Sequence, residues 1–505
     1  MKISNVMTSP IYALNDDVLL LTFSKNAQPE YEAIRNILAV SRVCHSWRTL
    51  ALETPSLWAS ALNINALTQL PEKGKQEIIR RTGSAPLSFA GDVRSWSYQQ
   101  FLFRTVLHEY WPRIRHLDIL IRPSLVDTYD EGWCAIYQPA PYLEEFSIMF
   151  STFQAEEPTD TSDEEDDETE HVIHIPPGFF GGDAPLLRSF SCPSIHDFDL
   201  SAPWLMNLRH LLFGQGGEDG KIGISLATFL GTLDNMKNLE TLHISTEYLV
   251  VPEDPTVTLP TAHLPRLLDI RLEPEYSLKR RDTLLTGVSL LKHLVPAAGC
   301  GLHVRLKERS GRLSLQHTKN LLHESLAMHS KNWFDVGMDK APLTLHLNYR
   351  GITIAHQYTD WDQGRHFSVT IQDANDGHPE YLLFVLDAFS LCNFATITHL
   401  NLELDTEIYW TNSHVASFIA ALSNIHVLET DVKTLGAMTT ASKNYPELKD
   451  RVPFPILAQL QLREYFGRKA RGTVEDACRG FNEWRDQIGY PVTIVRPEVQ
   501  ISPYD

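Results

Sequence analysis

The cysteines of this chain lack the spacing that marks most metal and redox sites. The six are scattered, the closest two lie 58 residues apart, and no CxxC pair occurs. A zinc knuckle or a thioredoxin-like redox site therefore has no support in the sequence. Scattered cysteines are typical of proteins whose thiols stay reduced, so we expect this protein in the cytoplasm, the nucleus or both.

Long apolar runs and an excess of positive charge are also missing. The most apolar stretch, YLLFVLDAFSLCNFA, contains Asp387 and is shorter than the roughly 18 residues that a membrane-spanning helix needs. Near the N-terminus, Asn15, Asp16 and Asp17 interrupt the apolar sequence before the core of a secretory signal can form. The net charge is −19, from 44 lysines and arginines against 63 aspartates and glutamates. We therefore expect no binding to a membrane and none to nucleic acid.

Catalytic motifs are absent as well. The sequence contains no HExxH, GxSxG or Walker A motif. The glycine-rich segment GQGGEDGK, residues 214–221, departs from GxGxxG because Asp219 holds the last position. Its two acids would also oppose a phosphate, so it is interpreted as a loop. We expect a protein that is not an enzyme and that uses no cofactor and no metal ion.

The composition is that of a globular protein with one strongly acidic segment. Hydrophobic residues make up 43% and charged residues 21% of the 505 residues. This length predicts about two to four domains or one elongated body built of repeats. Between Glu156 and Glu170 lie ten acids and no base. Because these charges repel one another, residues 154–171 are expected to form a disordered insert.

Three interpretations of this acidic insert are open. The first is a solvated insertion without a function. The second is a regulatory or electrostatic element, because three consecutive acids follow Ser162, which suits an acidophilic kinase of the casein-kinase type. Ser162 is therefore a candidate phosphorylation site. The third is divalent-metal binding with His171 and His174, for which flexible acids lack a loop geometry.

The first sixty residues predict two helical stretches. Asn15 can cap a helix whose first turn carries two aspartates and whose remainder is apolar. After a polar loop, apolar residues recur at helical spacing over residues 34–51, and Pro55 is expected to end this stretch. One interpretation is a small helical bundle with Trp47 and Trp58 in its core.

The order of these residues resembles the F-box, whose pattern is Leu-Pro-x-Glu, an apolar helix ending in Phe, and an apolar helix with Val-Cys-x-x-Trp. The matching residues are Leu14, Asp17, Val18, Leu19 and Phe23, followed by Leu38, Val43, Cys44, Trp47, Arg48, Leu50 and Ala51. The segments LETPSLW and RRTGSAPLSFAG are similar to those after the box in the large fungal, basidiomycete-type F-box family with degenerate leucine-rich repeats. The resemblance covers about one fifth of the chain. This chain departs from the pattern at two positions, with Asn15 in place of the usual proline and Asp17 in place of the usual glutamate. We expect these changes to affect the affinity for the linker more than the fold.

The resemblance implies a bundle of short helices that docks on the Skp-type linker protein of a cullin ubiquitin ligase. Such docking places a helix in an apolar groove. The linker-binding residues carried over from the family are Leu14, Asp17, Val18, Leu19, Phe23, Val43, Cys44 and Trp47. Some of them must belong to the internal core instead, and the sequence does not divide the two groups.

A pattern of three apolar residues, spaced three and then two apart, recurs along the rest of the chain. It occurs in IRHLDI, LEEFSI, LRSFSC, LRHLLF, LETLHI, LLDIRL, ITHLNL and LAQLQL, which begin at residues 114, 143, 187, 208, 239, 267, 397 and 457. The spacing fits a leucine-rich repeat loosely, with insertions. Each pattern predicts a short parallel strand, and the stretches 225–236 and 414–425 predict helices between strands. A leucine-rich α/β protein without repeats is the alternative.

The segment from residue 273 to residue 396 is harder to assign. GLHVRLKE and PLTLHLNYR alternate like strands, whereas LLTGVSLLKHLV and QHTKNLLHESLAMHS have helical spacing. These elements are either further repeats or a small insertion. Arg271, Arg305 and Arg350 lie in or beside predicted strands, where they are either an anion site or solvated side chains.

The C-terminal segment predicts a cap for the repeats. TVEDACRGFNEWRDQIG forms a helix with Val474, Cys478, Phe481 and Trp484 nearly on one face, and the strand PVTIV follows. A helix and a strand of this kind are typical of the terminal unit of a repeat protein.

Together these features predict an α/β protein with an F-box at residues 1–65, a helical linker at 66–110 and an irregular leucine-rich-repeat-like solenoid at 111–505. The predicted function is that of a non-catalytic adaptor that brings a protein substrate of unknown identity to an SCF-type ubiquitin ligase. The alternative is a leucine-rich interaction scaffold without coupling to a ligase.

Overall fold

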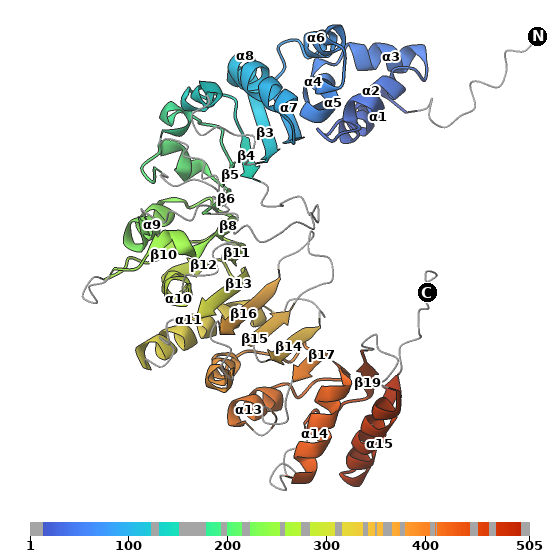
Figure 1. Cartoon of the computed structure of the whole chain (residues 1–505), viewed down its shortest axis with the longest axis vertical. Helices are drawn as coiled ribbons and strands as arrows, with labels where there is room; N and C mark the ends of the chain where they lie inside the picture. The colour runs from blue at the N-terminus through green and yellow to red at the C-terminus, as the bar shows by residue number, and fades with distance from the viewer. Residues whose placement is uncertain are drawn as a thin grey trace, which may run out of the picture. The chain divides into compact units, whose positions relative to one another are not determined.

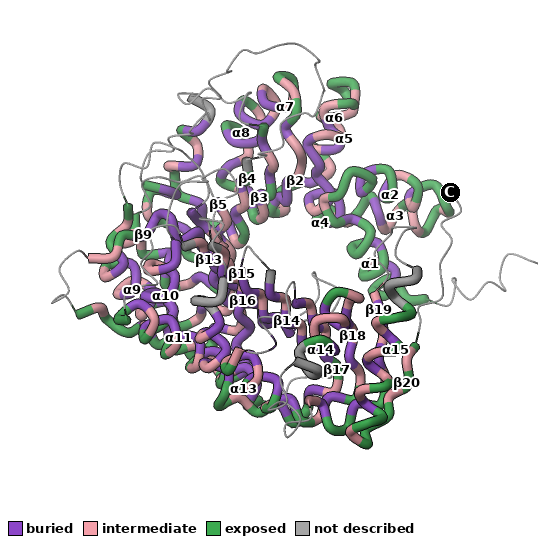
Figure 2. Tube along the Cα trace, turned by 60° about the horizontal axis from the view of Figure 1, so that its bottom comes forward, coloured by how far each residue is buried: buried purple, intermediate pink, exposed green. Residues whose placement is uncertain are grey.

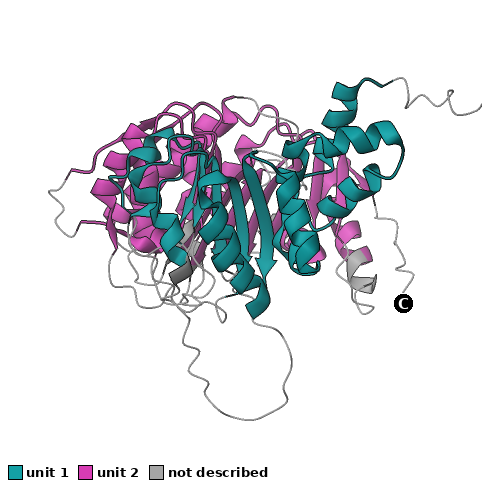
Figure 3. Cartoon of the chain, turned by 90° about the horizontal axis from the view of Figure 1, so that it is seen from above, with its two compact units in different colours: residues 1–222 teal, residues 223–505 magenta. Residues whose placement is uncertain are grey.

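The chain divides into two compact units, Met1–Ile222 (unit 1) and Gly223–Asp505 (unit 2), each drawn in its own colour in Figure 3. The computed structural model describes residues 14–122, 131–150, 178–192, 199–214, 223–252, 258–273, 283–308, 316–336, 342–348, 351–356, 366–373, 379–404, 410, 412–444, 453–463 and 471–495. Each unit is a mixed α/β body whose strands are mostly parallel, with helices against one side of the strands (Figure 1).

Unit 1 begins with short helices, and the first starts where the sequence predicts. The helices are α1 (Asp16–Lys25), α2 (Ala33–Val40), α3 (His45–Leu52), α4 (Pro55–Ala59), α5 (Ile64–Thr68) and α6 (Glu72–Arg81). Oδ1 of Asn15 accepts a hydrogen bond from the Val18 amide at 2.9 Å, which satisfies a free N–H at the helix start.

The second helical stretch is broken into two helices, α2 and α3. Sγ of Cys44 accepts a hydrogen bond from the Trp47 amide and so caps α3, which makes Cys44 a cap instead of an internal helical residue. Pro55, expected to end the stretch, instead opens α4 after α3 has ended at Leu52. A proline suits the first turn of a helix because the N–H it lacks has no acceptor there.

The remaining elements of unit 1 build a parallel sheet. They are β1 (Leu62–Asn63), β2 (Leu87–Val93), α7 (Trp96–Phe101), the π-helical segment η2 (Leu102–Leu107), α8 (His108–Tyr110), η3 (Trp111–Arg113), β3 (Ile114–Ile121), η5 (Glu131–Tyr137), β4 (Glu145–Phe150), η6 (Phe179–Gly182), β5 (Ser189–Cys192), η7 (Pro203–Asn207) and β6 (His210–Phe213). The strands follow one another in chain order, and equivalent apolar residues pair across them, for example Leu117 with Phe146 and Phe146 with Phe190. Residues 66–110, predicted as a helical linker, therefore contain strand β2 in addition to helices.

The core of unit 1 lies between these strands and the helical segments that follow them (Figure 2). Phe146 stacks on Phe190 with ring centroids 5.5 Å apart, and Phe180 meets Trp204 edge-on at 5.4 Å. Aromatic pairs of this geometry add stabilisation beyond the burial of their area.

Unit 2 has a longer sheet with helices along one side. Its helical segments are α9 (Leu226–Asn235), η8 (Thr246–Tyr248), α10 (Leu284–Lys292), α11 (Gln316–Phe334), η10 (Pro379–Phe389), α13 (Ser413–Ala421), α14 (Val432–Asn444) and α15 (Arg471–Gln487). The strands of the sheet are β8 (Thr241–Ile244), β11 (Asp269–Leu272), β13 (Gly301–Glu308), β14 (Leu343–Asn348), β15 (Gly351–His356), β16 (Phe367–Asp373), β17 (His399–Leu404), β18 (Val427–Thr430), β19 (Gln459–Leu462) and β20 (Thr493–Val495). Two small pairs lie apart, β7 (Ile224–Ser225) with β9 (Leu249–Val250) and β10 (Ala262–Leu264) with β12 (Leu294–Pro296).

The middle of unit 2 contains an insertion in the parallel pattern. The strand order is β8-β11-β13-β16-β15-β14-β17-β18-β19-β20, so β14, β15 and β16 form a meander between β13 and β17. Strand β15 is antiparallel to both of its neighbours, whereas β14 is parallel to β17 and β16 is parallel to β13. Within residues 273–396, β13 therefore continues the parallel series from β11, and the meander of β14, β15 and β16 departs from it.

All eight recurrent patterns contain strands, which confirms this part of the prediction. In each of them the apolar residues are buried and alternate with half-exposed or exposed residues, as in β19, where Leu460 and Leu462 are buried. The helices predicted over residues 225–236 and 414–425 are α9 and α13. The C-terminal helix buries Cys478 and Phe481, and β20 follows it. The acidic insert with Ser162, and Arg350, lie outside the described residues.

Candidate functional site

Helix α1 is apolar on two sides, and only one of them is covered by the chain. Leu19 and Phe23 are 4% and 3% exposed, so they belong to the core of the helical bundle. Leu14 and Val18 are each 42% exposed, and Leu21 is 66% exposed. Val18 and Leu21 are three residues apart, which places them on one face of the helix, and Leu14 lies just before the capping residue Asn15.

The predicted linker-binding residues fall into three classes of exposure. Leu14, Asp17, Val18 and Val43 are exposed, Leu19 and Phe23 are buried, and Cys44 and Trp47 are intermediate. The exposed residues can meet a partner directly. The buried and intermediate ones hold the helices together, as Cys44 does by capping α3.

Three exposed apolar residues of this region are missing from the sequence-based prediction. Leu21 is the most exposed of them, Tyr31 precedes α2 with 40% exposure, and Leu52 ends α3 with 37% exposure. The signal for Leu21 is present in the sequence, because the run VLLL is too apolar for a helix with one buried face.

A serine, a histidine and a glutamate meet in unit 1, but not in a geometry for nucleophilic catalysis. The Ser88 hydroxyl lies 2.9 Å from Nδ1 of His116, whose Nε2 lies 3.7 Å from Oε2 of Glu144. The same oxygen of Glu144 accepts a hydrogen bond from Arg115 at 2.8 Å, and this bond is the main cause of the lowered pKa of Glu144. Ser88 is only 6% exposed, so a substrate carbonyl has no access to its hydroxyl. This cluster joins β2 to β3 and to the start of β4.

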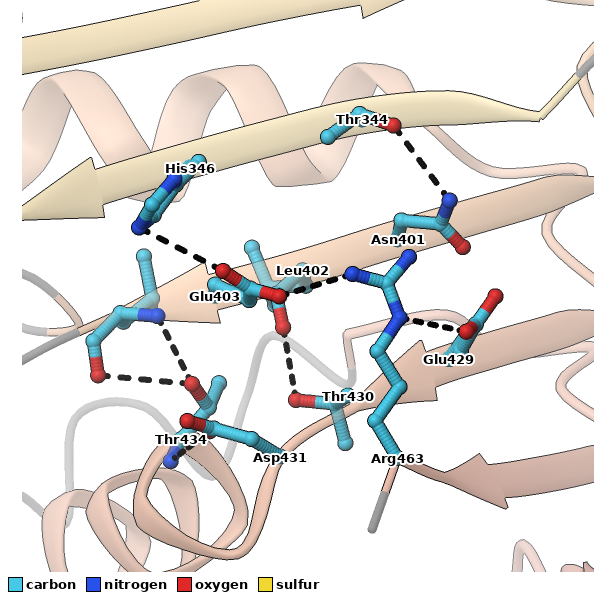
Figure 4. Close-up of polar contacts among 11 residues, drawn as sticks. Thr344, His346, Asn401, Leu402, Glu403, Glu429, Thr430, Asp431, Thr434 and Arg463 are labelled. Atoms are coloured by element: carbon cyan, nitrogen blue, oxygen red, sulfur yellow. Dashed lines mark hydrogen bonds and ion pairs between the residues drawn. The ribbon is translucent and has the colours of Figure 1, made fainter. Parts of the chain in front are cut away.

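Unit 2 carries a polar network on the side of its sheet that faces away from the helices (Figure 4). Arg463, at the end of β19, donates from Nη1 to Glu403 at 2.8 Å and from Nε to Glu429 at 2.5 Å. When the side-chain amide of Asn401 is turned so that its oxygen and nitrogen exchange places relative to Figure 4, it donates to Oε2 of Glu429 at 2.7 Å and accepts from Nη2 of Arg463 at 3.1 Å. Burial disfavours the charged form of Arg463, but the two carboxylates outweigh it and raise its pKa.

The network continues onto the neighbouring strands. Nε2 of His346 lies 3.4 Å from Glu403, and Thr344 lies 3.4 Å from the amide of Asn401. The side chains of His346, Glu403 and Arg463 are 36%, 20% and 38% exposed, so they are held in place while remaining open to a partner.

A second polar cluster lies over β8, β11 and β13. Oε1 of Glu273 accepts from Nε2 of His303 at 2.7 Å, and Oε2 lies 3.9 Å from His243. The hydrogen bond from His303 lowers the pKa of Glu273 to about 2. Burial lowers the pKa of His243. Arg271 is held by Asp269 at 2.8 Å on the strand between them.

These three clusters join side chains of neighbouring strands to one another. Within the described ranges, no three histidine, cysteine or carboxylate side chains gather as metal ligands do. No helix in the part of the chain that the structure describes combines the length and the apolar character needed to cross a bilayer. A scan against models of protein families finds no match to this chain, and a search of curated proteins finds none either.

Proposed function

We propose that this protein is a substrate-recognition adaptor of an SCF-type ubiquitin ligase, which binds a Skp-type linker through its N-terminal helices and a protein target through the rest of the chain. The observation that carries the proposal is the exposed apolar face of α1, formed by Val18 and Leu21, together with the exposed Leu14 just before the helix. A helix that is apolar on its outer side needs a partner to cover that side. The F-box-like order of residues names the linker as this partner.

The physical size of the exposed face suits a protein interface. Fully burying a leucine or valine side chain contributes about 1.5–3 kcal/mol, and these three are already half covered, so their burial adds roughly 3 kcal/mol. Such a cluster can act as the anchor of an interface whose rim is polar. Asp17, exposed on the same helix, supplies a rim charge.

The target would be held by the strands that follow. We propose that they form an irregular leucine-rich-repeat-like solenoid, because the recurrent patterns pair in parallel and in register. Ubiquitin transfer would take place on another subunit, and this chain would contribute proximity between the target and that subunit. Its six cysteines are free thiols, which suits the reducing cytoplasm or nucleus.

A pull-down of the purified full chain with a purified Skp-type linker tests the proposal. The informative variant is Val18→Asp combined with Leu21→Asp, because both side chains are exposed and the fold does not depend on them. We expect this variant to lose the linker. Leu391→Asp is the matched control, since Leu391 is 72% exposed in unit 2 and should leave binding unchanged.

Two results would speak against the adaptor. The native chain could fail to bind the linker, or the double variant could bind as well as the native chain. Either result would favour the alternative of a leucine-rich scaffold without ligase coupling. Asn15 is the residue behind this alternative, because it caps α1 at the position where the F-box pattern has proline.

A further inference from the structure

Two arginines lie side by side in unit 1, where strands β2 and β3 end. The two strands pair in parallel up to Val93 and Ile121, and the Arg122 amide continues the ladder by donating to the carbonyl oxygen of Val93. Arg94 and Arg122 are therefore the next residues on neighbouring strands, with their Cα atoms about 5 Å apart. Val93 and Ile121 are buried on the helix side of the sheet, so the alternation of a strand places both arginines on the opposite side.

Only one of these arginines has a carboxylate partner in the described part of the chain. Nε of Arg94 pairs with Asp92, two residues earlier, and the Arg94 side chain is 62% exposed. Arg122 is exposed, and among the described residues its side chain takes part in no ion pair or hydrogen bond. Asp118, the next carboxylate on this side of β3, lies roughly 13 Å from Arg122 along the strand, where salt screens the attraction between exposed charges. Two cations against one carboxylate leave one positive charge at this strand end.

The side chain of Asn65, on α5, holds the end of β2 in place. Its Oδ1 accepts from the Asp92 amide at 2.7 Å, and its Nδ2 donates to the Asp92 carbonyl oxygen at 2.5 Å. These two bonds fix the backbone shortly before Arg94, and the Asp92 carboxylate orients the Arg94 guanidinium. A partner therefore meets a strand end that it does not have to order on binding.

Exposed apolar side chains lie close to the two arginines. Met149 of β4 pairs with Leu120 of β3, which is two residues before Arg122 and on the same side of the sheet. Met149 is 38% exposed and Leu120 is partly exposed, and Trp96, 62% exposed, follows Arg94 by two residues. Arginine, methionine and tryptophan are among the residue types that protein interfaces favour. A small anion would neutralise the charge but leave these apolar groups in water, so the combination fits a protein segment better.

We propose that this end of the sheet binds an extended protein segment through a carboxylate and an apolar side chain two residues away from it. The carboxylate accepts from the guanidinium groups of Arg94 and Arg122, as paired arginine donors favour. Met149 lies one strand across and two residues along from Arg122, roughly 8 Å away, and alternate residues of an extended chain lie on one side about 7 Å apart. A segment with the spacing Glu-x-Leu therefore reaches both groups. The inference deepens the proposed function and rests on it only in assigning the segment to the target.

Peptide binding to the full chain, measured by fluorescence anisotropy with an uncharged dye, tests the inference without the linker. The probe is Gly-Ser-Glu-Ser-Leu-Ser-Gly. Its controls carry glutamine in place of glutamate, glycine in place of leucine, or glutamate and leucine as direct neighbours. We expect the probe to bind about fivefold more tightly than the glutamine peptide and about threefold more tightly than the other two, and to weaken with salt. Equal affinities of the probe and any control, or no binding of the probe, would overturn the inference and leave the linker pull-down unaffected.

Variants of the protein locate the binding to this strand end. Arg122→Gln removes an exposed cation whose loss leaves no carboxylate unpaired among the described residues, and it should weaken the probe about fivefold. Arg122→Lys keeps the charge without the planar donors, so an intermediate loss is expected. Arg104→Gln is the matched control, because Arg104 is an exposed arginine of the same unit on η2, and it should change nothing. If Arg122→Gln and Arg104→Gln behave alike, the segment does not bind here.

Two further variants test the apolar contact and a competing occupant. Met149→Ser should weaken the probe about threefold and leave the glycine peptide unchanged, because only the probe has a side chain to pack there. The second is a chain without residues 154–171, whose acids could themselves supply a carboxylate. The probe should bind the native chain and the shortened chain alike. Binding to the shortened chain alone would make the acidic insert the occupant of this strand end and would overturn the inference of a target segment.

Discussion

The ring of Trp47 packs edge-on against that of Phe23, with centroids 5.1 Å apart and planes at 63°. This contact joins α3 to α1 in the N-terminal bundle, in which Phe23 is buried and Trp47 is partly exposed. Because α1 carries the exposed apolar face, the contact also fixes the direction in which that face points.

Trp47→Ala is expected to destabilise the bundle by about 2 kcal/mol, since it removes the aromatic pair and leaves Phe23 uncovered. Denaturant unfolding followed by circular dichroism measures the change. Trp96→Ala is the matched control, because Trp96 is 62% exposed at the start of α7 and should cost less than about 0.5 kcal/mol. If the two variants lose the same free energy of unfolding, the contact between Trp47 and Phe23 does not stabilise the bundle.

Asn15→Ala should lower the stability of α1 by about 1 kcal/mol, because the hydrogen bond to the Val18 amide is lost. Asn15→Asp keeps an acceptor at the same place and adds a negative charge at the positive end of the helix, so it should be neutral or stabilising. Thermal unfolding of both variants beside the native chain decides this. An alanine variant as stable as the aspartate variant would show that the cap has no energetic role.

The lowered pKa of Glu273 predicts that the folded protein loses stability in acid. The hydrogen bond from His303 lowers its pKa to about 2, so the folded protein favours the ionised form more than the unfolded chain does. This stabilisation is complete above the ordinary glutamate pKa and is lost as the pH falls from about 4.5 to about 2, by at most about 3 kcal/mol.

Glu273→Gln should therefore lose less stability than the native chain between pH 6 and pH 3, as measured by denaturant unfolding at each pH. Glu324→Gln is the control, because the side chain of Glu324 is 58% exposed and its pair with Lys292 is open to solvent. If the free energy of unfolding of Glu273→Gln falls between pH 6 and pH 3 by as much as that of the native chain, the His303 contact is not the cause of the acid sensitivity.

Arg485 holds the C-terminal helix to the chain around it. The side chain is almost fully buried and donates to the carbonyl oxygens of Tyr490, Pro453 and Phe454 at 2.8, 2.9 and 3.3 Å. Burial lowers its pKa, and the three carbonyl groups compensate for part of the lost hydration.

Arg485→Ala should destabilise unit 2 by about 3–5 kcal/mol, because it empties a buried site and removes the donors of the Tyr490 and Pro453 carbonyl groups, while the Phe454 carbonyl keeps the Leu457 amide. Arg485→Lys keeps the charge but not the planar set of donors, so an intermediate loss is expected. Chemical denaturation gives both values. The control is Arg479→Ala, whose exposed pair with Asp476 should contribute less than about 0.5 kcal/mol; a similar loss there would rule out a special role for Arg485.

Local patterns determined the elements of this protein. The spacing of Leu117 and Ile119, or of Leu400 and Leu402, predicts a strand with one buried side, because alternate residues of a strand point to opposite faces. The helix start at Asn15 is equally local, since the cap involves only the residues of the first turn. The sequence by itself was therefore sufficient to place the strands of the recurrent patterns and the first helix.

Only the tertiary structure decided which of these elements are neighbours and which apolar residues remain exposed. The insertion of β14, β15 and β16 between β13 and β17 depends on pairing between strands that are far apart in the sequence, and no local pattern encodes it. Val18 and Leu19 are equally apolar, and packing against the other helices buries one and leaves the other exposed. The meeting of Glu403, Glu429 and Arg463 has the same cause, because side chains from three strands become neighbours only when the sheet has formed.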